Sequence, residues 1–296
     1  MAALSRKRIK AAFDESGIQI WSRQPLLQFI QKHCEHWSQD DASPDSFPLP
    51  AVATVTQVLN LLVKQTQLKS VSLPFPYRSV TRFVWGEVST YSLIQAVDAQ
   101  GYFTHYTAMQ LHNLTDQIPK AIYFNVEQPA TGGGGSLTQG GIDRAFKGKC
   151  RVTNNVIKFR DVTIHKVNGQ NTGRLGVESM QMADGSTTQV TNLERTLIDI
   201  AVRPIYSGGV AEVSDAYKAA ADKVSGNRLT TYLKSLNYTY PYHQVIGYYM
   251  DRAGNYSESQ IKRIQAIPRE HDFYLTYQIK NPAYNEKWRL FVPNGF

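Results

Sequence analysis

The sequence predicts an α+β protein of two domains that meet near Val88. Three helical patterns followed by a hairpin pattern occupy residues 1–88, which indicates one small domain. Helical and strand patterns succeed one another over residues 89–296, which indicates a larger mixed α/β domain. The chain has 296 residues and is 42% hydrophobic, so it is long and apolar enough to bury two cores.

The charge balance is basic, with 32 Lys and Arg residues against 24 Asp and Glu residues and a formal net charge of +8. Such a balance permits nucleic-acid binding without demonstrating it. No apolar run approaches the roughly 18 residues of a membrane span, and no apolar segment follows the basic N-terminus as in a signal peptide. Cys34 and Cys150 have neither disulfide nor metal spacing. We therefore expect a cytoplasmic protein with free thiols and no membrane partner.

The first domain begins with helical patterns over residues 5–15 and 22–37 and continues into a more regular helix over residues 54–67. Thr54 and Gln57 have capping-box spacing at the start of this third helix. Its apolar face is formed by Val55, Val58, Leu59 and Leu62.

The opposite face of the third helix is polar and mostly uncharged, with Gln57, Asn60 and Lys64. Amide side chains pair with adenine edges in the major groove, so this face is suited to reading DNA. The same composition occurs on any solvated helix. Both interpretations stay open at this point.

A strand, a proline-containing turn and a second strand follow, and Arg78 and Arg82 have the parity of one strand face. Three helices followed by a basic hairpin form the element order of a winged helix-turn-helix, whose third helix enters the major groove while the hairpin touches the backbone. The expected DNA-binding residues are Thr54, Thr56, Gln57, Asn60, Lys64, Lys69, Arg78 and Arg82.

Helices of the second domain are expected over residues 89–99, 104–112, 227–236, 241–250 and 257–267. Strands are expected over residues 119–126, 156–159, 162–165, 175–182 and 187–190, with two more near the C-terminus. The glycine-rich residues 131–141 are expected to form a flexible surface loop. They do not lead into a Walker loop, because Gly148-Lys149 is followed by Cys150 where Ser or Thr is required.

Residues 190–220 contain two successive helix patterns around which the second domain is organised. Thr191 and Glu194 have capping-box spacing at the start of the first helix. Pro204 ends that helix, because proline supplies no N–H and disfavours helical geometry in the preceding residue. Residues 208–209 are both glycine and turn the chain into the second helix.

Charged residues of the second domain suggest two further interactions. Arg195 and Asp199 lie four residues apart on one helix, so that they can form a pair worth about 0.2–0.5 kcal/mol if exposed. On charge alone, candidates for nucleic-acid or partner contact are Arg144, Lys147, Lys149, Arg151, Arg195 and Arg203.

A search of the sequence for catalytic and metal-binding motifs leads to no predicted site. His105 and His112 are seven residues apart on one expected helix, a spacing that does not bring both to one ion. Asp161, Glu178 and Glu194 can be grouped into a nuclease-like set, but no Glu-x-Lys follows. We expect no catalytic residue, no metal and no cofactor.

Four segments of the second domain carry a resemblance to a known family. They read LTDQIP at residues 114–119, NLERTLIDIAVRP at 192–204, YPYHQ at 240–244 and WRL at 288–290. With these segments, residues 89–296 resemble the AbiEi family, the antitoxin and autorepressor halves of bacterial type IV toxin–antitoxin systems. The resemblance is weaker over the first 88 residues.

The resemblance implies a non-enzymatic antitoxin and transcriptional repressor that acts in phage defence. Such a protein binds inverted repeats in its own promoter as paired subunits and counteracts a nucleotidyltransferase toxin, without a stable complex between the two. Two alternatives stay open. One is a nuclease-like component of a defence system, and the other is a plain winged-helix transcription factor with a sensing C-terminal domain.

Overall fold

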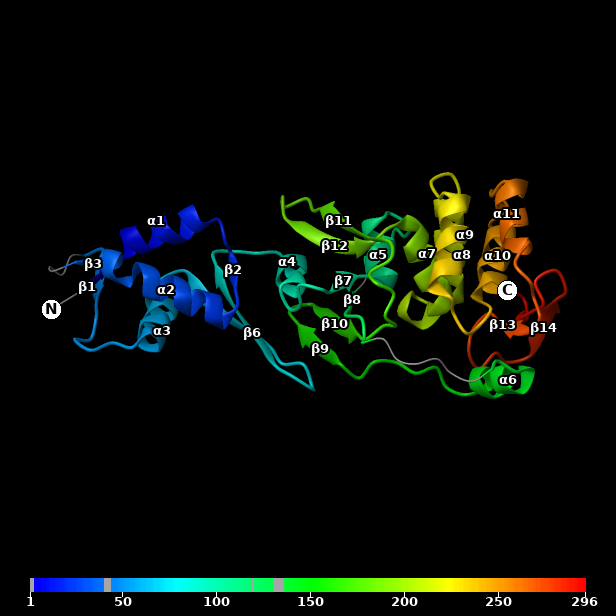
Figure 1. Ribbon diagram of the computed structural model, residues 1–296, viewed down its shortest axis with the longest axis horizontal. Coiled ribbons are helices and arrows are strands. Elements are labelled where there is room, and N and C mark those ends of the chain that lie inside the picture. Colours follow the sequence, from blue (N-terminus) through cyan, green and yellow to red (C-terminus); the bar gives the residue numbers. More distant parts are fainter. Residues whose placement is uncertain (1–2, 40–43, 119, 130–135) are drawn as a thin grey trace. The chain divides into compact units, whose positions relative to one another are not determined.

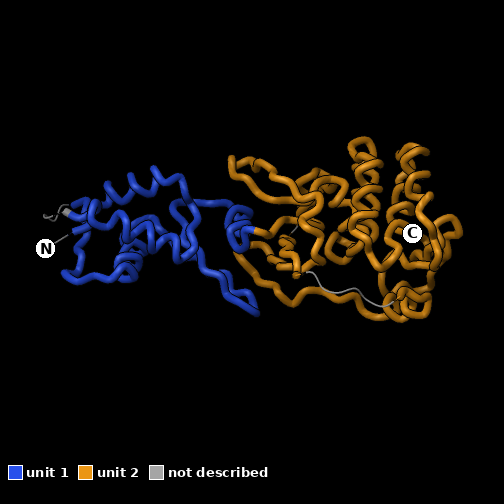
Figure 2. The backbone as a smooth tube through the Cα atoms, in the orientation of Figure 1, with its two compact units in different colours: residues 1–99 blue, residues 100–296 orange. Residues whose placement is uncertain are grey.

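The structure, a computed structural model, describes residues 3–39, 44–118, 120–129 and 136–296. The chain forms two compact units, residues 1–99 and 100–296 (Figure 2). Both units mix helices with strands, in agreement with the α+β class. The first unit ends at Ala99 rather than at Val88, because the short helix α4 (Thr90–Gln95) belongs to it.

The first unit combines helices with two small antiparallel sheets (Figure 1). Its other helices are α1 (Arg6–Ser16), α2 (Arg23–Trp37) and α3 (Val55–Gln65). One sheet has the strand order β2 (Ile20–Trp21), β6 (Val80–Trp85) and β5 (Leu68–Leu73). The other has the order β3 (Ser38–Gln39), β1 (Ala3–Ser5) and β4 (Ser46–Pro48).

The third helix begins as the sequence predicts. Thr54 Oγ1 accepts a hydrogen bond from Gln57 N at 3.3 Å, and Gln57 Oε1 accepts one from Thr54 N at 2.8 Å, so the capping box is confirmed. Leu62 of α3 is fully buried. In the same core, Phe13 of α1 stacks on Trp85 of β6 with ring centroids 4.2 Å apart. Helix packing therefore fixes which face of α3 is left to solvent.

A six-stranded mixed sheet forms the scaffold of the second unit. Its strand order is β11 (Val177–Gln181), β12 (Thr187–Thr191), β7 (Tyr102–Phe103), β8 (Ala121–Asn125), β10 (Val162–Val167) and β9 (Val156–Phe159). The pairs β12–β7 and β8–β10 are parallel, and the other neighbours are antiparallel. The carboxyl ends of β8 and β10 consequently lie at the same edge of the sheet.

Helices and a second small sheet complete this unit (Figure 1). The helices are α5 (His105–Leu111), α6 (Gln139–Lys147), α7 (Leu193–Val202), α8 (Val210–Ala220), α9 (Gly226–Leu236), α10 (Tyr242–Ala253) and α11 (Glu258–Gln265). The strands are β13 (Phe273–Tyr274), β15 (Leu290–Pro293) and β14 (Pro282–Asn285). Helix α7 is buried almost throughout and packs against α5, α8, α9 and α10.

Helix α7 begins differently from the prediction. Its N-cap is Asn192, whose Oδ1 accepts a hydrogen bond from Arg195 N at 3.1 Å, so the expected capping box of Thr191 and Glu194 is wrong. Glu194 instead accepts a hydrogen bond from Ser225 N at 2.8 Å, at the start of α9. The carboxylate of Glu194 therefore bonds to a residue distant in the sequence and not to the N-terminus of its own helix.

The turns and loops of this unit agree in part with the predictions. Helix α7 ends before Pro204, and Gly208 and Gly209 have φ angles of 79° and 93° ahead of α8, as the double glycine requires. Of the expected glycine loop, residues 131–135 lie outside the described residues, whereas residues 139–141 are the first turn of α6 and not a loop. Among the described helices, none has both the length and the apolar character needed to cross a membrane.

Candidate functional site

The exposed face of α3 carries the polar residues that the sequence assigned to DNA. Thr56, Asn60 and Lys64 are exposed on this face. Thr54 and Gln57 are exposed as well, but their side chains are joined in the capping box. Thr56, Asn60 and Lys64 are therefore the polar groups on this helix best placed for an external partner.

The hairpin after α3 places its three basic residues in three different environments. Lys69 on β5 forms an exposed ion pair with Glu87. Arg78 is exposed in the turn, because strand β6 begins only at Val80. The expectation that Arg78 and Arg82 share one strand face is therefore wrong.

Arg82 serves the internal structure of the first unit. Its Nε donates to the carbonyl oxygen of Ala96 at 2.6 Å, and its Nη2 donates to that of Val97 at 2.9 Å. Hydrogen bonds of a charged group are worth about 1.5–3 kcal/mol each, so this guanidinium fastens the segment after α4 to the sheet. Arg82 is thereby removed from the expected phosphate contacts.

The basic residues of the second unit fall into two groups. Those on or just after α6 are exposed: Arg144, Lys147 and Lys149. Those that line a common pocket are Arg151, Arg195 and Arg203. Within this second group Arg151 is exposed and Arg203 half-buried, but Arg195 is buried. The interpretation of Arg195 as a surface contact is thus corrected.

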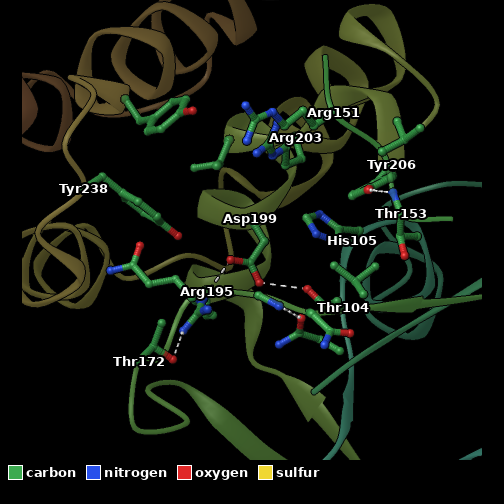
Figure 3. A pocket seen from close by; sticks show the side chains of 18 of the residues that line it. Thr104, His105, Arg151, Thr153, Thr172, Arg195, Asp199, Arg203, Tyr206 and Tyr238 are labelled. Atoms are coloured by element: carbon green, nitrogen blue, oxygen red, sulfur yellow. Dashed lines mark hydrogen bonds and ion pairs between the residues drawn. The ribbon is translucent and has the colours of Figure 1, made fainter. Parts of the chain in front are cut away.

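The pocket has a volume of about 470 Å³ and lies at one edge of the six-stranded sheet (Figure 3). Asn125 and Val167, the last residues of the parallel strands β8 and β10, both line it. Ligands of open α/β sheets are commonly bound at the carboxyl ends of parallel strands. Tyrosines supply much of the remaining wall, at positions 102, 206, 238, 240, 242 and 277.

A buried ion pair fixes the floor of this pocket. Arg195 Nε donates to Asp199 Oδ1 at 2.8 Å, and Thr104 Oγ1 donates to Asp199 Oδ2, also at 2.8 Å. Arg195 Nη1 also donates to the carbonyl oxygen of Leu175, at 2.8 Å, and to Thr172 Oγ1 at 3.2 Å. Burial opposes the charge of Arg195, but the neighbouring Asp199 outweighs it and raises the pKa of the guanidinium. Asp199 is therefore the partner that holds the buried guanidinium of Arg195 in its charged form.

His105 introduces an unsatisfied polar atom beside that pair. Its side chain is buried, with Asp199 and Tyr206 nearby in the view of Figure 3. Its Nδ1 has no hydrogen-bond partner among the described residues, and its backbone φ is 52°. Burial lowers the pKa of its imidazole to about 4, so the ring is neutral at pH 7. A left-handed, non-glycine residue with an orphaned buried nitrogen indicates a functional constraint.

Arg203 and Arg151 supply the uncompensated positive charge of the pocket. Arg203 Nη1 donates to Cys150 Sγ at 3.2 Å, and its guanidinium carbon lies 5.9 Å from the ring centroid of Tyr277. Neither arginine takes part in an ion pair among the described residues. Asp199 is the acidic residue of the lining, and Arg195 already neutralises it. An anion is therefore the ligand charge that this pocket favours.

Sequence reasoning missed His105 and the tyrosines as members of one site. His105 was weighed only as a metal ligand together with His112, whose Nε2 lies 2.6 Å from the carbonyl oxygen of Thr191 instead. The aromatic density of residues 238–242, which read YTYPY, was the available signal. The remaining tyrosines come from distant parts of the chain and only the fold gathers them.

The carboxylates of the nuclease alternative are engaged separately. Asp161 is exposed in the turn between β9 and β10, and Glu178 Oε1 accepts a hydrogen bond from Asn192 Nδ2 at 2.8 Å. Glu194 is buried and faces Arg228 at 3.4 Å. Across the described chain, no cluster of three His, Cys, Asp or Glu side chains is suited to holding a metal ion. The geometry therefore gives the nuclease alternative no support.

Comparison with known proteins gives a structural likeness without a function. The chain matches no protein-family model and no curated protein. Its structure is similar to the crystal structure of the Rv2827c protein from Mycobacterium tuberculosis, with a TM-score of 0.59 and 14% sequence identity. The likeness covers 99% of this chain and 96% of that protein. At this identity it establishes a shared fold alone.

Proposed function

We propose that the first unit is a winged helix-turn-helix domain that binds double-stranded promoter DNA. The observation that carries this proposal is the order α1, β2, α2, α3 and the β5–β6 hairpin, in which β2 pairs with β6 and the short strands β3 and β4 lie between α2 and α3. This order leaves the polar face of α3 exposed after its apolar face has entered the core. A helix so supported can enter a major groove.

The side chains of this surface divide into two roles. Asn60 is the candidate for a base edge, since its amide can pair with adenine. Lys64 and Arg78 are the candidates for phosphate, and Lys69 can join them by exchanging Glu87 for a phosphate oxygen. Phosphate contacts position the domain and make its affinity depend on salt, whereas contacts from α3 select the sequence.

For the whole chain we infer an antitoxin and autoregulatory repressor of a type IV toxin–antitoxin operon in phage defence, acting in the cytoplasm. The resemblance of residues 89–296 to the AbiEi family supports this reading, with the motif at residues 192–204 forming the central helix α7. The functional partner is then a nucleotidyltransferase toxin, counteracted without a stable complex. DNA binding by paired subunits to inverted repeats would couple the amount of antitoxin to transcription.

Two assays test the two halves of this function separately. The repressor half is tested by binding to the DNA upstream of the chain's own gene. The antitoxin half is tested by co-expression with the nucleotidyltransferase encoded beside it, scored as restored growth. A full-length variant with Asn60, Lys64 and Arg78 all changed to alanine should lose DNA binding and retain rescue. Failure of the wild-type chain to restore growth contradicts the antitoxin half.

A second candidate function is a transcription factor whose second unit senses a small ligand. The pocket lined by Arg151 and Arg203 favours it, because concave sites with a few polar groups are the usual places of ligand binding. The co-expression assay separates the two candidates, since a plain transcription factor does not relieve a toxin when the toxin is expressed from an unrelated promoter.

A further inference from the structure

We propose that the pocket of the second unit binds a nucleotide, with its phosphate on Arg151 and Arg203 and its base against the tyrosines. This inference goes beyond the antitoxin and repressor function and does not depend on it. The residues that carry it all belong to the second unit. The ligand class follows from the combination of charge, aromatic surface and an unsatisfied polar atom in one cavity.

The charge of the lining selects an anion. It contains three arginines, and the carboxylate of Asp199 neutralises the buried one, Arg195. The guanidinium groups of Arg151 and Arg203 remain available to an anion. Guanidinium groups bind phosphate through paired hydrogen bonds, which makes arginine the usual side chain for planar, multidentate recognition of that group.

The aromatic side chains select a planar group next to that anion. The guanidinium of Arg203 already lies over the ring of Tyr277, so the phosphate position adjoins an aromatic wall. Tyr238, Tyr240 and Tyr242 form a further aromatic part of the lining. Stacking of a base on aromatic side chains strengthens binding and tolerates any base, because each base has a π-face. A nucleotide has both a phosphate and a planar ring, so it matches this lining better than a simple anion does.

His105 adds a buried imidazole with an unsatisfied nitrogen to the same lining. Its side chain is only 8% exposed, and its Nδ1 has no partner among the described residues. A buried polar atom without a partner is costly, so a ligand group that pairs with it is favoured. A ribose hydroxyl both donates and accepts, and can therefore satisfy either neutral tautomer once the imidazole ring turns its buried Nδ1 toward the cavity.

The size of the cavity agrees with this ligand. Pockets for small molecules commonly measure about 300–1,000 Å³, and this one measures about 470 Å³. The same chemistry can come from a free mononucleotide or from the phosphorylated end of a single strand. The shared unit is one nucleotide with a 5′-phosphate, and the experiment below separates the two sources.

The test is titration calorimetry on the full-length protein. The ligands are AMP, GMP, CMP and UMP, the four matching nucleosides, inorganic phosphate, and a short RNA with a 5′-phosphate. We expect a 5′-phosphorylated ligand to bind at least about tenfold more tightly than the matching nucleoside or inorganic phosphate, because both parts of the pocket are then filled. Binding of mononucleotides identifies the free source, and binding of the RNA alone identifies a strand end.

Single substitutions test whether the ligand binds in this pocket. Arg151→Ala removes an exposed side chain, and Arg203→Ala removes its half-buried neighbour in the lining, and each should weaken the phosphorylated ligand by about tenfold or more. Arg144→Ala, an exposed arginine on α6 outside the pocket, is the matched control and should bind as the wild type does. RNA binding counts for the pocket only if Arg151→Ala weakens it and Arg78→Ala leaves it unchanged.

Three results would overturn the proposal. The first is that no mononucleotide and no phosphorylated RNA binds below millimolar concentration. The second is that Arg151→Ala binds as tightly as the wild type. The third is that inorganic phosphate binds as tightly as the nucleotides, since the aromatic part of the pocket would then contribute nothing.

Discussion

Arg195 and Asp199 form an ion pair of 2.8 Å between Nε and Oδ1, with side chains only 5% and 8% exposed. Glu258 and Lys262 on α11 form an ion pair with the same spacing of four residues, but these side chains are 81% and 67% exposed. Identical spacing in the sequence therefore produces one pair in the floor of a pocket and one pair on a surface. The energetic consequences differ because only the first pair is removed from water.

Removal of one member should distinguish the two pairs. Asp199→Ala leaves the Arg195 charge buried without a counter-ion, and we expect the free energy of unfolding to fall by about 3–5 kcal/mol. Glu258→Ala breaks an exposed pair and should lower it by no more than about 0.5 kcal/mol. Urea unfolding followed by circular dichroism measures both changes. Equal effects of the two variants would show that Asp199 is not buried with its partner as described.

The imidazole of His105 should make stability depend on pH. Burial holds its folded-state pKa at about 4, below the value of about 6.5 expected in the unfolded chain. As the pH falls from 6.5 toward 4, the unfolded chain takes up a proton that the folded chain refuses. Folding is then weakened by up to about 1.4 kcal/mol per pH unit.

The variant His105→Asn isolates this effect, because asparagine does not titrate. The wild type should lose stability more steeply than the variant between pH 6.5 and 4, while above pH 6.5 the difference between the two should stay constant. Unfolding free energies measured at several pH values give both slopes. Parallel curves through the acidic range would contradict a buried, neutral His105.

Gly247 of α10 should not tolerate a side chain. A Cβ added there would lie 2.2 Å from the indole ring of Trp288, which is fully buried and donates from Nε1 to Asp251 Oδ2 at 2.6 Å. We expect Gly247→Ala to cost about 1–3 kcal/mol or more, because neither the ring nor the helix has room to move. Gly140→Ala is the control. Its Cβ would meet Arg144 only at 3.9 Å, and alanine favours the helix by up to about 1 kcal/mol. The thermal midpoints should therefore shift in opposite directions.

Arg78 and Arg82 should respond differently to alanine although both are basic residues of one hairpin. Arg78 is exposed, so Arg78→Ala should weaken DNA binding for all sequences and reduce the salt slope of log K by about 0.9 per lost phosphate contact. Arg82 bonds to the carbonyl groups of Ala96 and Val97, so Arg82→Ala should lower the stability of the first unit. Salt-dependent anisotropy and urea unfolding of both variants measure this. The hairpin assignment fails if only Arg82→Ala changes the salt slope.

Local signals in the sequence predicted much of the fold. The capping box of Thr54 and Gln57 and the double glycine before α8 are contained within a few residues, and the structure has both. The same rule failed for Thr191 and Glu194, because the carboxylate of Glu194 accepts a hydrogen bond from Ser225 N at the start of α9. A motif of local spacing is reliable only where no distant group competes for its side chains.

Local signals of this kind do not predict the pocket. Its lining brings together residues as far apart as Tyr102 and Tyr277, and strand pairing between β8 and β10 decides where its edge lies. Arg195 was assigned to a surface contact because its charge can be read from the sequence, whereas its burial cannot. Charge can be counted along a chain, whereas burial depends on which helices enclose α7.

The most direct test of the proposed function measures DNA binding by the full-length protein through fluorescence anisotropy. One duplex is the DNA from upstream of its own gene, and the other is a scrambled duplex of equal length. The measurement is repeated between about 50 and 200 mM salt, because phosphate contacts dominate non-specific affinity. We predict binding to the upstream DNA about 10³-fold or more tighter than to the scrambled duplex, with Asn60→Ala reducing that ratio. Equal affinity for the two duplexes at every salt concentration would contradict the account of the first unit as a sequence-reading domain.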